Sequence, residues 1–317
     1  MKNKKIVFAG TNKFSSEHLH ELLINKLNIL NVITKKDNKF NKKNKTFSEV
    51  KKISLKNKLN IIQPKSLNSK KIYKYLKKKK PDIMIVVSYG LLIPKKIINL
   101  FTFGCINIHT SLLPKLRGPS PIQYSLIQGK KKTGITIIQI NEKIDSGDIL
   151  YQKSLIIKKN ETYKTLIKKL SILGKQSLIK CLKKIFLKKI KKIKQKEKNA
   201  TYTKKINKID GLINWNSSAK KIEQKIRAFI VWPGSFFFIK EIMIKIWKVK
   251  VVKNSNKNIP GKIIKINKHG IFITTKKNLI NIKILQIPGK KKITTKNIIH
   301  SYKDLFKIGT NLNKKPS

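Results

Sequence analysis

The residues best suited to chemistry lie between Cys105 and Gln123, where the chain reads CINIHTSLLPKLRGPSPIQ. The stretch begins as an apolar strand, but Asn107 and His109 interrupt it two residues apart and therefore lie on one face of the strand. Burying an amide and an imidazole is costly unless each is hydrogen-bonded. Two such groups at the end of a strand, before a loop rich in Pro and Gly, predict a functional site.

A second polar interruption follows a later apolar strand, in the segment INEKIDSGDIL. Asp145 and Asp148 there bracket Ser146 and Gly147. Taken singly, these residues have ordinary explanations, because Asn107 can cap a strand end and Asp145 can belong to a turn. Taken together, an Asn, a His and an Asp can converge on one site.

The Asn-x-His pair, the following SLLPxxRGxxP and the distant Asp-x-Gly-Asp resemble the folate-dependent formyltransferases. The family's order is also followed by FAGTNKF, VVSYGLLIPK, GITIIQINEKIDSGDIL, ATYTKKI, IRAFIVWPGS and IPGKKK. The resemblance implies transfer of a formyl group from 10-formyltetrahydrofolate, through a tetrahedral carbon that bears an oxyanion. Asn107 would donate a hydrogen bond to the oxyanion, and His109 would donate to it or transfer a proton. Asp145 would orient the imidazole and help a water relay the proton of the attacking amine.

The resemblance continues past Tyr202, which bears on the formyl acceptor. It is closest to the family members that act on initiator methionyl-tRNA, so it implies that tRNA as partner and tetrahydrofolate as product. A purine-pathway member would resemble only the first domain, and a formyltetrahydrofolate hydrolase would carry a different amino-terminal module. A basic RNA-binding protein that has lost turnover is a further alternative, although the intact Asn107, His109 and Asp145 argue against it. The reaction requires no metal, and the sequence indicates no metal site.

The resemblance also implies a folate site after two of the strands. A flat pterin needs an apolar slot with polar backbone groups at its rim. Leu112 and Leu113 can instead be plain core residues, and for these two alone the core interpretation is the stronger. The expected folate-binding residues are Ser111, Leu112, Leu113, Pro114, Tyr89 and Gly90.

The tRNA contacts are expected at basic positions. In the family, the region that corresponds to Lys35 to Lys45 carries a Gly- and Arg-containing insertion that contacts the acceptor end of the tRNA. This chain has Lys and Asn there, and a lysine holds a phosphate without the bidentate fork of an arginine. The expected tRNA-binding residues are Lys39, Lys42, Lys43, Arg227 and Lys290.

Apolar strands alternate with helical patterns in the first part of the chain. The strand Lys5 to Ala9, a helix capped by Ser15 or Ser16, and the strand Ile29 to Thr34 predict a parallel pair joined by a helix. We therefore predict a doubly wound, Rossmann-like α/β domain over residues 1–189 and a basic linker over 190–207. Over 208–317, five short strands separated by Gly, Pro and Asn predict a small antiparallel β-barrel, of the oligonucleotide-binding type found in the resembled family.

The composition is extreme, with a formal net charge of +61 on 317 residues. Such a charge favours RNA contact, but lysines recur in every segment, as compositional drift would also produce, so both interpretations stay open. The two cysteines have no partner at ligand spacing, which predicts neither a disulfide nor a zinc site and fits a reducing cytoplasm. No run of eighteen apolar residues occurs. We expect a cytoplasmic monomer that does not bind membranes.

Overall fold

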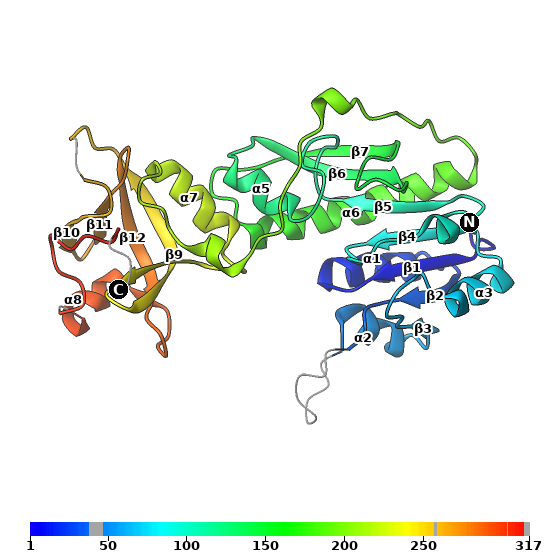
Figure 1. Ribbon diagram of the computed structural model, residues 1–317, viewed down its shortest axis with the longest axis horizontal. Helices are drawn as coiled ribbons and strands as arrows, with labels where there is room; N and C mark the ends of the chain where they lie inside the picture. The colour runs from blue at the N-terminus through cyan, green and yellow to red at the C-terminus, as the bar shows by residue number, and fades with distance from the viewer. Residues whose placement is uncertain (38–46, 257–258, 303, 314–317) are drawn as a thin grey trace. The chain divides into compact units, whose positions relative to one another are not determined.

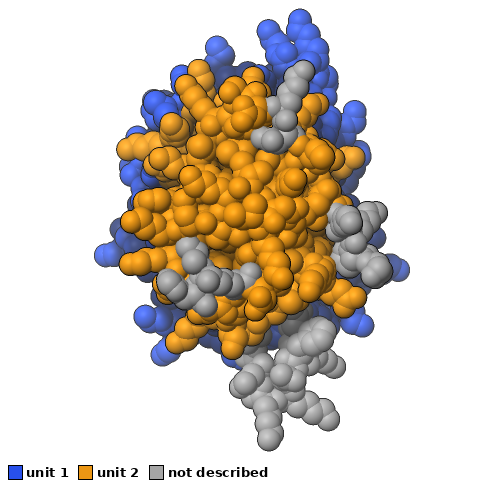
Figure 2. All heavy atoms as spheres, turned by 90° about the vertical axis from the view of Figure 1, so that its left-hand side faces the viewer, with its two compact units in different colours: residues 1–121, 132–156, 167–203 blue, residues 122–131, 157–166, 204–317 orange. Residues whose placement is uncertain are grey.

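The computed structural model describes residues 1–37, 47–256, 259–302 and 304–313. The chain divides into two compact units, coloured separately in Figure 2. The first consists of Met1–Pro121, Lys132–Ile156 and Ile167–Thr203, and the second of Ile122–Lys131, Ile157–Leu166 and Lys204–Ser317. Residues 190–203, expected to form most of the linker, thus belong to the first unit by their contacts.

A mixed sheet of seven strands, in the order β3-β2-β1-β4-β5-β6-β7, forms the centre of the first unit (Figure 1). β1 to β5 run parallel, while β6 and β7 are antiparallel to their neighbours. The order reverses between β1 and β4, so the predicted doubly wound α/β architecture is confirmed. The strands are β1 Ile6–Gly10, β2 Ile29–Ile33, β3 Ile61–Ile62, β4 Ile83–Val87, β5 Cys105–His109, β6 Lys132–Gln139 and β7 Ile149–Ile156.

Helices cover both faces of this sheet. On one face α1 and α6 lie side by side. Ser171 of α6 donates a hydrogen bond to Glu17 of α1, and Lys175 Nζ of α6 lies 3.5 Å from Glu21 Oε2 of α1. The helices of this part of the chain are α1 Lys13–Ile24, α2 Glu49–Lys56, α3 Lys70–Lys79, α4 Lys95–Ile98, α5 Pro121–Ile127 and α6 Tyr163–Phe186, with a 3₁₀ turn at Glu197–Asn199.

The opposite face carries α3 and α4. Leu76 of α3 and Ile97 of α4 belong to one buried apolar cluster with Cys105 of β5. Side chains alternate along a strand, so Asn107 and His109 share the face of Cys105. The polar pair therefore lies on the α3 and α4 side of the sheet.

The start of α1 corrects one expectation. The N-cap is Asn12, whose side chain accepts a hydrogen bond from the backbone N–H of Ser15 at 3.0 Å, so the prediction of a cap at Ser15 or Ser16 was wrong. Phe14 is already buried on the apolar face of the helix, which therefore begins earlier than its leucines indicated.

The second unit is an antiparallel β domain, as predicted. Its strands follow the order β10-β11-β12-β9-β8, with β13 paired to β12, and every pairing is antiparallel. Most of α5 and the first residues of α6 also belong to this unit. Its elements from Lys204 onward are a 3₁₀ turn at Lys208–Gly211, α7 Ala219–Ala228, β8 Ser235–Ile239, β9 Ile242–Val252, β10 Ile263–Asn267, β11 Gly270–Thr274, β12 Leu279–Gln286, β13 Ile293–Thr294 and α8 Thr295–Ser301.

Within the described ranges, no helix is long and apolar enough to cross a membrane. Cys105 and Cys181 are both free and buried, and burial raises the pKa of Cys181 to about 12. Both sulfurs are therefore protonated thiols at neutral pH and pack as small apolar groups.

Candidate active site

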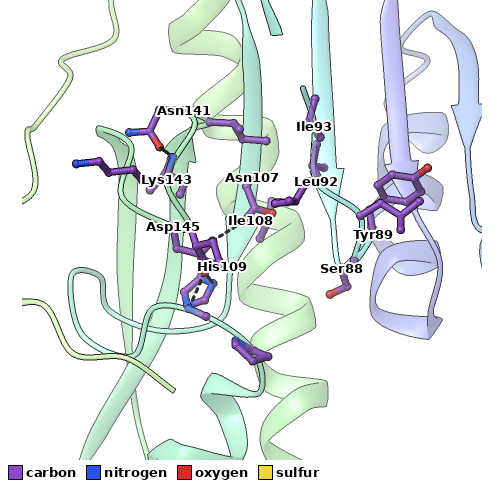
Figure 3. A pocket seen from close by; sticks show the side chains of 18 of the residues that line it. Ser88, Tyr89, Leu92, Ile93, Asn107, Ile108, His109, Asn141, Lys143 and Asp145 are labelled. Atoms are coloured by element: carbon purple, nitrogen blue, oxygen red, sulfur yellow. Dashed lines mark hydrogen bonds and ion pairs between the residues drawn. The ribbon is translucent and has the colours of Figure 1, made fainter. Parts of the chain in front are cut away.

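A cavity of about 640 Å³ in the first unit contains the predicted catalytic residues. Its walls come from the segment after β4, from the end of β5 and from the loop between β6 and β7 (Figure 3). Both β4 and β5 end here, one strand away from the point where the strand order reverses. Open α/β sheets bind their ligands outside the carboxyl ends of their strands, and the cavity lies at such ends, close to the reversal point.

Asp145 is the residue on which the site converges. Its Oδ1 accepts a hydrogen bond from Asn107 Nδ2 at 3.2 Å, and its Oδ2 accepts one from the backbone N–H of Gly118 at 2.8 Å. His109 Nδ1 lies 3.5 Å from the same Oδ2. Figure 3 shows the three side chains turned toward one another. The structure thus brings together Asn107, His109 and Asp145 from two segments of the chain.

The imidazole of His109 is held from both sides. Its Nε2 lies 2.9 Å from the carbonyl oxygen of Leu116, and its Nδ1 faces Asp145. Only 6% of His109 is exposed. A carbonyl and a carboxylate accept hydrogen bonds, so a ring that carries a proton on each nitrogen can donate to both.

The backbone around the cavity is unusual. Asp145 adopts a φ of 49°, Leu116 one of 62°, and Ser88 and Ser120 have φ values of 46° and 63°. Residues other than glycine rarely adopt this left-handed conformation, and such residues cluster at functional sites because the surrounding contacts must hold them there.

Gly147 explains the Asp-x-Gly spacing seen in the sequence. A Cβ atom at this position would lie 1.7 Å from the carbonyl oxygen of Gln139, so only glycine allows the loop to approach β6 this closely. The side chain of Asn141 accepts hydrogen bonds from the Lys143 N–H at 3.1 Å and the Ser146 hydroxyl at 3.0 Å, which fixes the rest of the loop.

A second cluster of polar side chains, centred on Arg117, lies next to these loops. The guanidinium is 1% exposed, and it donates to both carboxylate oxygens of Glu197, to Gln195 Oε1 and to the hydroxyl of Tyr202. These hydrogen bonds lower the pKa of Glu197. The partners of Arg117 were not foreseen, because they lie in the segment expected to be a basic linker. The one available signal was the presence of Gln and Glu in that run of lysines.

The expected folate-binding residues divide into two groups. Tyr89 and Gly90 line the cavity, although the ring of Tyr89 is turned away from Asp145 (Figure 3), and burial raises its pKa to about 12. The segment from Ser111 to Pro114 is not among the lining residues. Ser111 Oγ donates to Lys115 O at 2.7 Å, and Leu113 belongs to a buried apolar cluster.

The expected tRNA contacts are placed only in part. Lys39, Lys42 and Lys43 lie outside the described residues. Arg227 is paired with Glu223 on its own helix, and its Nη1 donates to the carbonyl oxygen of Glu161 at 2.7 Å. Lys290 is exposed in the turn after β12.

Comparisons with known proteins show the family of the chain. The Formyl transferase family matches residues 4–182, and the Formyl transferase, C-terminal domain family matches residues 205–303. A methionyl-tRNA formyltransferase of Buchnera aphidicola subsp. Acyrthosiphon pisum (strain APS) is 49% identical over 98% of this chain and 99% of its own. One from Wigglesworthia glossinidia brevipalpis is 42% identical over 97% and 98% of the two chains.

Solved structures show the same fold at lower identity. WlaRD, a sugar 3N-formyl transferase crystallised in the presence of dTDP and 5-N-formyl-THF, superposes with a TM-score of 0.66 at 23% identity, over 91% of this chain and 99% of that one. HypX from Aquifex aeolicus in complex with tetrahydrofolic acid gives 0.63 at 14% identity, over 95% of this chain. This chain spans 47% of HypX.

The two matched domains and the fold define the chain as a formyl transferase. Its identity to relatives that it covers almost completely is more specific. Within that class, the chain belongs to the methionyl-tRNA formyltransferase family.

Proposed function

We propose that the protein transfers the formyl group of 10-formyltetrahydrofolate to the amino group of methionyl initiator tRNA, for translation initiation. The observation that carries the proposal is the convergence of Asn107, His109 and Gly118 on the carboxylate of Asp145 inside a cavity. Relatives named methionyl-tRNA formyltransferase support the choice of acceptor. The cavity therefore holds the formyl group while the aminoacyl end of the tRNA enters from solvent.

The first step is attack of the amine on the formyl carbon, which places negative charge on the formyl oxygen. The side-chain amide nitrogen of Asn107 carries two hydrogens, and it donates one of them in a hydrogen bond to Asp145. The second hydrogen is donated to the oxyanion. His109, when protonated, supplies positive charge close to the same atom, so both residues stabilise the transition state more than the substrate.

The second step breaks the bond between the formyl carbon and the N10 nitrogen of the folate. The amine must lose a proton and N10 must gain one, so the net result is one proton moved between two nitrogens. Asp145 accepts the proton of the amine through a water, and His109 is the proton-transfer group beside it. The carboxylate thereby orients the imidazole and takes part in the relay.

The cavity wall suits the ring system of the donor. Leu92, Ile93 and Ile140 line it with apolar side chains, and a flat pterin needs such a surface. The solved relatives that were crystallised with folates support this assignment. Tyr89 and Gly90 are proposed contacts at its edge, whereas a contribution from Ser111, Leu112, Leu113 or Pro114 would come from behind the lining residues.

The second unit is proposed to bind the tRNA. Lys290 is exposed there, and Lys39, Lys42 and Lys43 are proposed contacts from the first unit. Arg227 would have to give up Glu223 to reach a phosphate, so we assign it the weakest contact. We propose that the protein acts as a monomer, with residues 1–189 as catalytic domain, 190–207 as linker and 208–317 as tRNA-binding domain.

The test is formyl transfer from 10-formyltetrahydrofolate to initiator tRNA charged with methionine. Uncharged tRNA and the Asp145→Asn variant are the controls. With the formyl donor present, we expect the native protein to turn over charged tRNA but not uncharged tRNA. We expect this turnover to be lost in the Asp145→Asn variant. Tight tRNA binding without turnover would instead favour an RNA-binding protein that has lost the reaction.

A further inference from the structure

Gln195 uses every hydrogen-bonding position of its side-chain amide between Arg117 and the loop of Asp145. Its Oε1 accepts from Arg117 Nε at 3.1 Å and Nη2 at 2.9 Å. Its Nε2 donates to the carbonyl oxygens of Asp145 at 2.9 Å and Gly147 at 2.7 Å. An amide offers two lone pairs and two hydrogens, so all four are in use. Gln195 is 6% exposed and is not among the residues that line the cavity.

Gln195 contacts the backbone of Asp145, which has an uncommon conformation. Asp145 has a φ of 49°, a left-handed conformation that residues with a side chain adopt rarely, although Asp and Asn do so more often than others. Gln195 binds the carbonyl of that residue, and Gly118 N–H binds its carboxylate at 2.8 Å. Backbone and side chain of Asp145 are thus fixed by two different segments.

The segment that follows Gln195 also fixes the loop that contains Leu116 and Arg117. Arg117 N donates to Thr201 O at 2.8 Å, Thr203 N donates to Arg117 O at 2.8 Å, and the Thr201 hydroxyl accepts from Leu116 N at 2.8 Å. Leu116 provides the carbonyl that holds His109 Nε2. The segment from Gln195 to Thr203 therefore supports both loops that orient the imidazole and the carboxylate.

We propose that Gln195 is a positioning residue for formyl transfer. It holds the backbone of Asp145 so that the carboxylate stays in contact with Asn107 and His109, and Arg117 holds Gln195 in its turn. This inference rests on the proposed function, because it concerns the rate of the same reaction. It gives the segment expected to be a linker a part in the chemistry, although Gln195 touches no substrate.

Two substitutions separate the two sides of the amide. Gln195→Glu keeps the acceptor for Arg117 but replaces the two donors with a carboxylate oxygen that faces two carbonyls. Gln195→Met has nearly the same length and loses both sides. Lys196→Met is the matched control, because it places the same side chain at the next, exposed position.

The experiment measures kcat, the KM values for both substrates and the thermal midpoint for each variant. We expect kcat to fall about tenfold or more in Gln195→Glu and Gln195→Met, as for the loss of precise orientation. Both KM values should change less than twofold, and Lys196→Met should keep the native kcat. The thermal midpoints show whether each variant is folded at the assay temperature, where the loss of kcat should persist.

A double variant makes the test specific to Asp145. If Gln195 acts through that residue, Gln195→Met should slow the reaction no further in an Asp145→Asn background. A native kcat in both Gln195 variants, or an equal loss with and without the Asp145 carboxylate, would overturn the inference while leaving the proposed function intact. Full activity of Asp145→Asn itself would instead overturn the proposed function.

Discussion

The two units differ in what they bury. In the first, the buried side chains include His109, Arg117 and Gln195, and each has hydrogen-bonding partners close to the cavity. In the second, apolar residues such as Trp215 and Phe237 form the main cluster, and the buried polar side chains, Thr274 and Asn281 among them, do not line the cavity. Buried polar groups cost free energy unless they are paired, so a hydrogen-bonded set of them beside the cavity indicates where stability is constrained by function. Under the proposed function, the second unit is a stable frame whose surface binds the tRNA.

A substitution in the core of the second unit should change stability without changing the rate of formyl transfer. Trp215 is 1% exposed and packs edge-to-face on Phe237, with ring centroids 5.6 Å apart. Trp215→Ala should lower the free energy of unfolding by about 3–5 kcal/mol, because it leaves a large cavity. Chemical denaturation checks this. The single-turnover rate of the molecules that remain folded should be native, and a lower rate would mean that the second unit takes part in the chemistry.

Acid should affect the first unit through His18, a residue outside the site. Burial is the main cause that lowers its pKa to about 4 from 6.5, so the folded protein binds a proton there less readily than the unfolded chain does. The contribution of His18 to the free energy of unfolding should therefore be fully present above pH 6.5. It should fall by about 3 kcal/mol as the pH drops from 6.5 to about 4. Denaturation of the native protein and of His18→Gln across that range measures the difference. Equal pH dependence in the two proteins would contradict the assignment.

The site itself should separate rate from binding. His109→Ala should slow formyl transfer on the order of a hundredfold, as expected for a residue that stabilises charge and transfers protons. Its dissociation constant for tRNA, measured by filter binding, should stay within about twofold of the native value. His20→Ala, an exposed histidine of α1, is the control and should keep the native rate. A nearly native rate in His109→Ala would show that the cavity has been assigned wrongly.

The smallest effect is expected on the surface of the second unit. Lys290→Ala should weaken tRNA binding a few-fold and reduce the slope of log affinity against log salt by about one, since one phosphate contact is lost. Lys2→Ala, at an exposed position of the first unit, provides the comparison. If both lysines gave the same small change, the charge would act as a diffuse background, and no single contact could be assigned to Lys290.

The sequence predicted the sheet and the meeting of Asn107, His109 and Asp145 for physical reasons. β4 is a continuous apolar run because both of its faces are buried, and Asn107 and His109 stand out since they interrupt such a run. Asp145 stands out because the polar segment that contains it, INEKIDSGDIL, follows another apolar strand. These signals are local, so they can be seen in a single chain.

The remaining part of the site depends on contacts between distant segments. Gln195 meets Arg117 across 78 positions, and the run of lysines around it has neither helical nor strand periodicity. Its composition alone is typical of a solvated linker. The cap of α1 and the short α8 were missed for a related reason, because packing decides the ends of helices and the formation of short ones.

The most direct test of an interlocked site is the single-turnover rate of formyl transfer in the native protein, Asn107→Ala, Asp145→Asn and the double variant. All four are compared with 10-formyltetrahydrofolate and charged initiator tRNA at saturating concentrations. Residues that act as one unit are not additive, so the double variant should be no more than a few-fold slower than the slower single variant. If the two losses multiplied instead, Asn107 and Asp145 would act independently, and the hydrogen bond between them would have no part in the reaction.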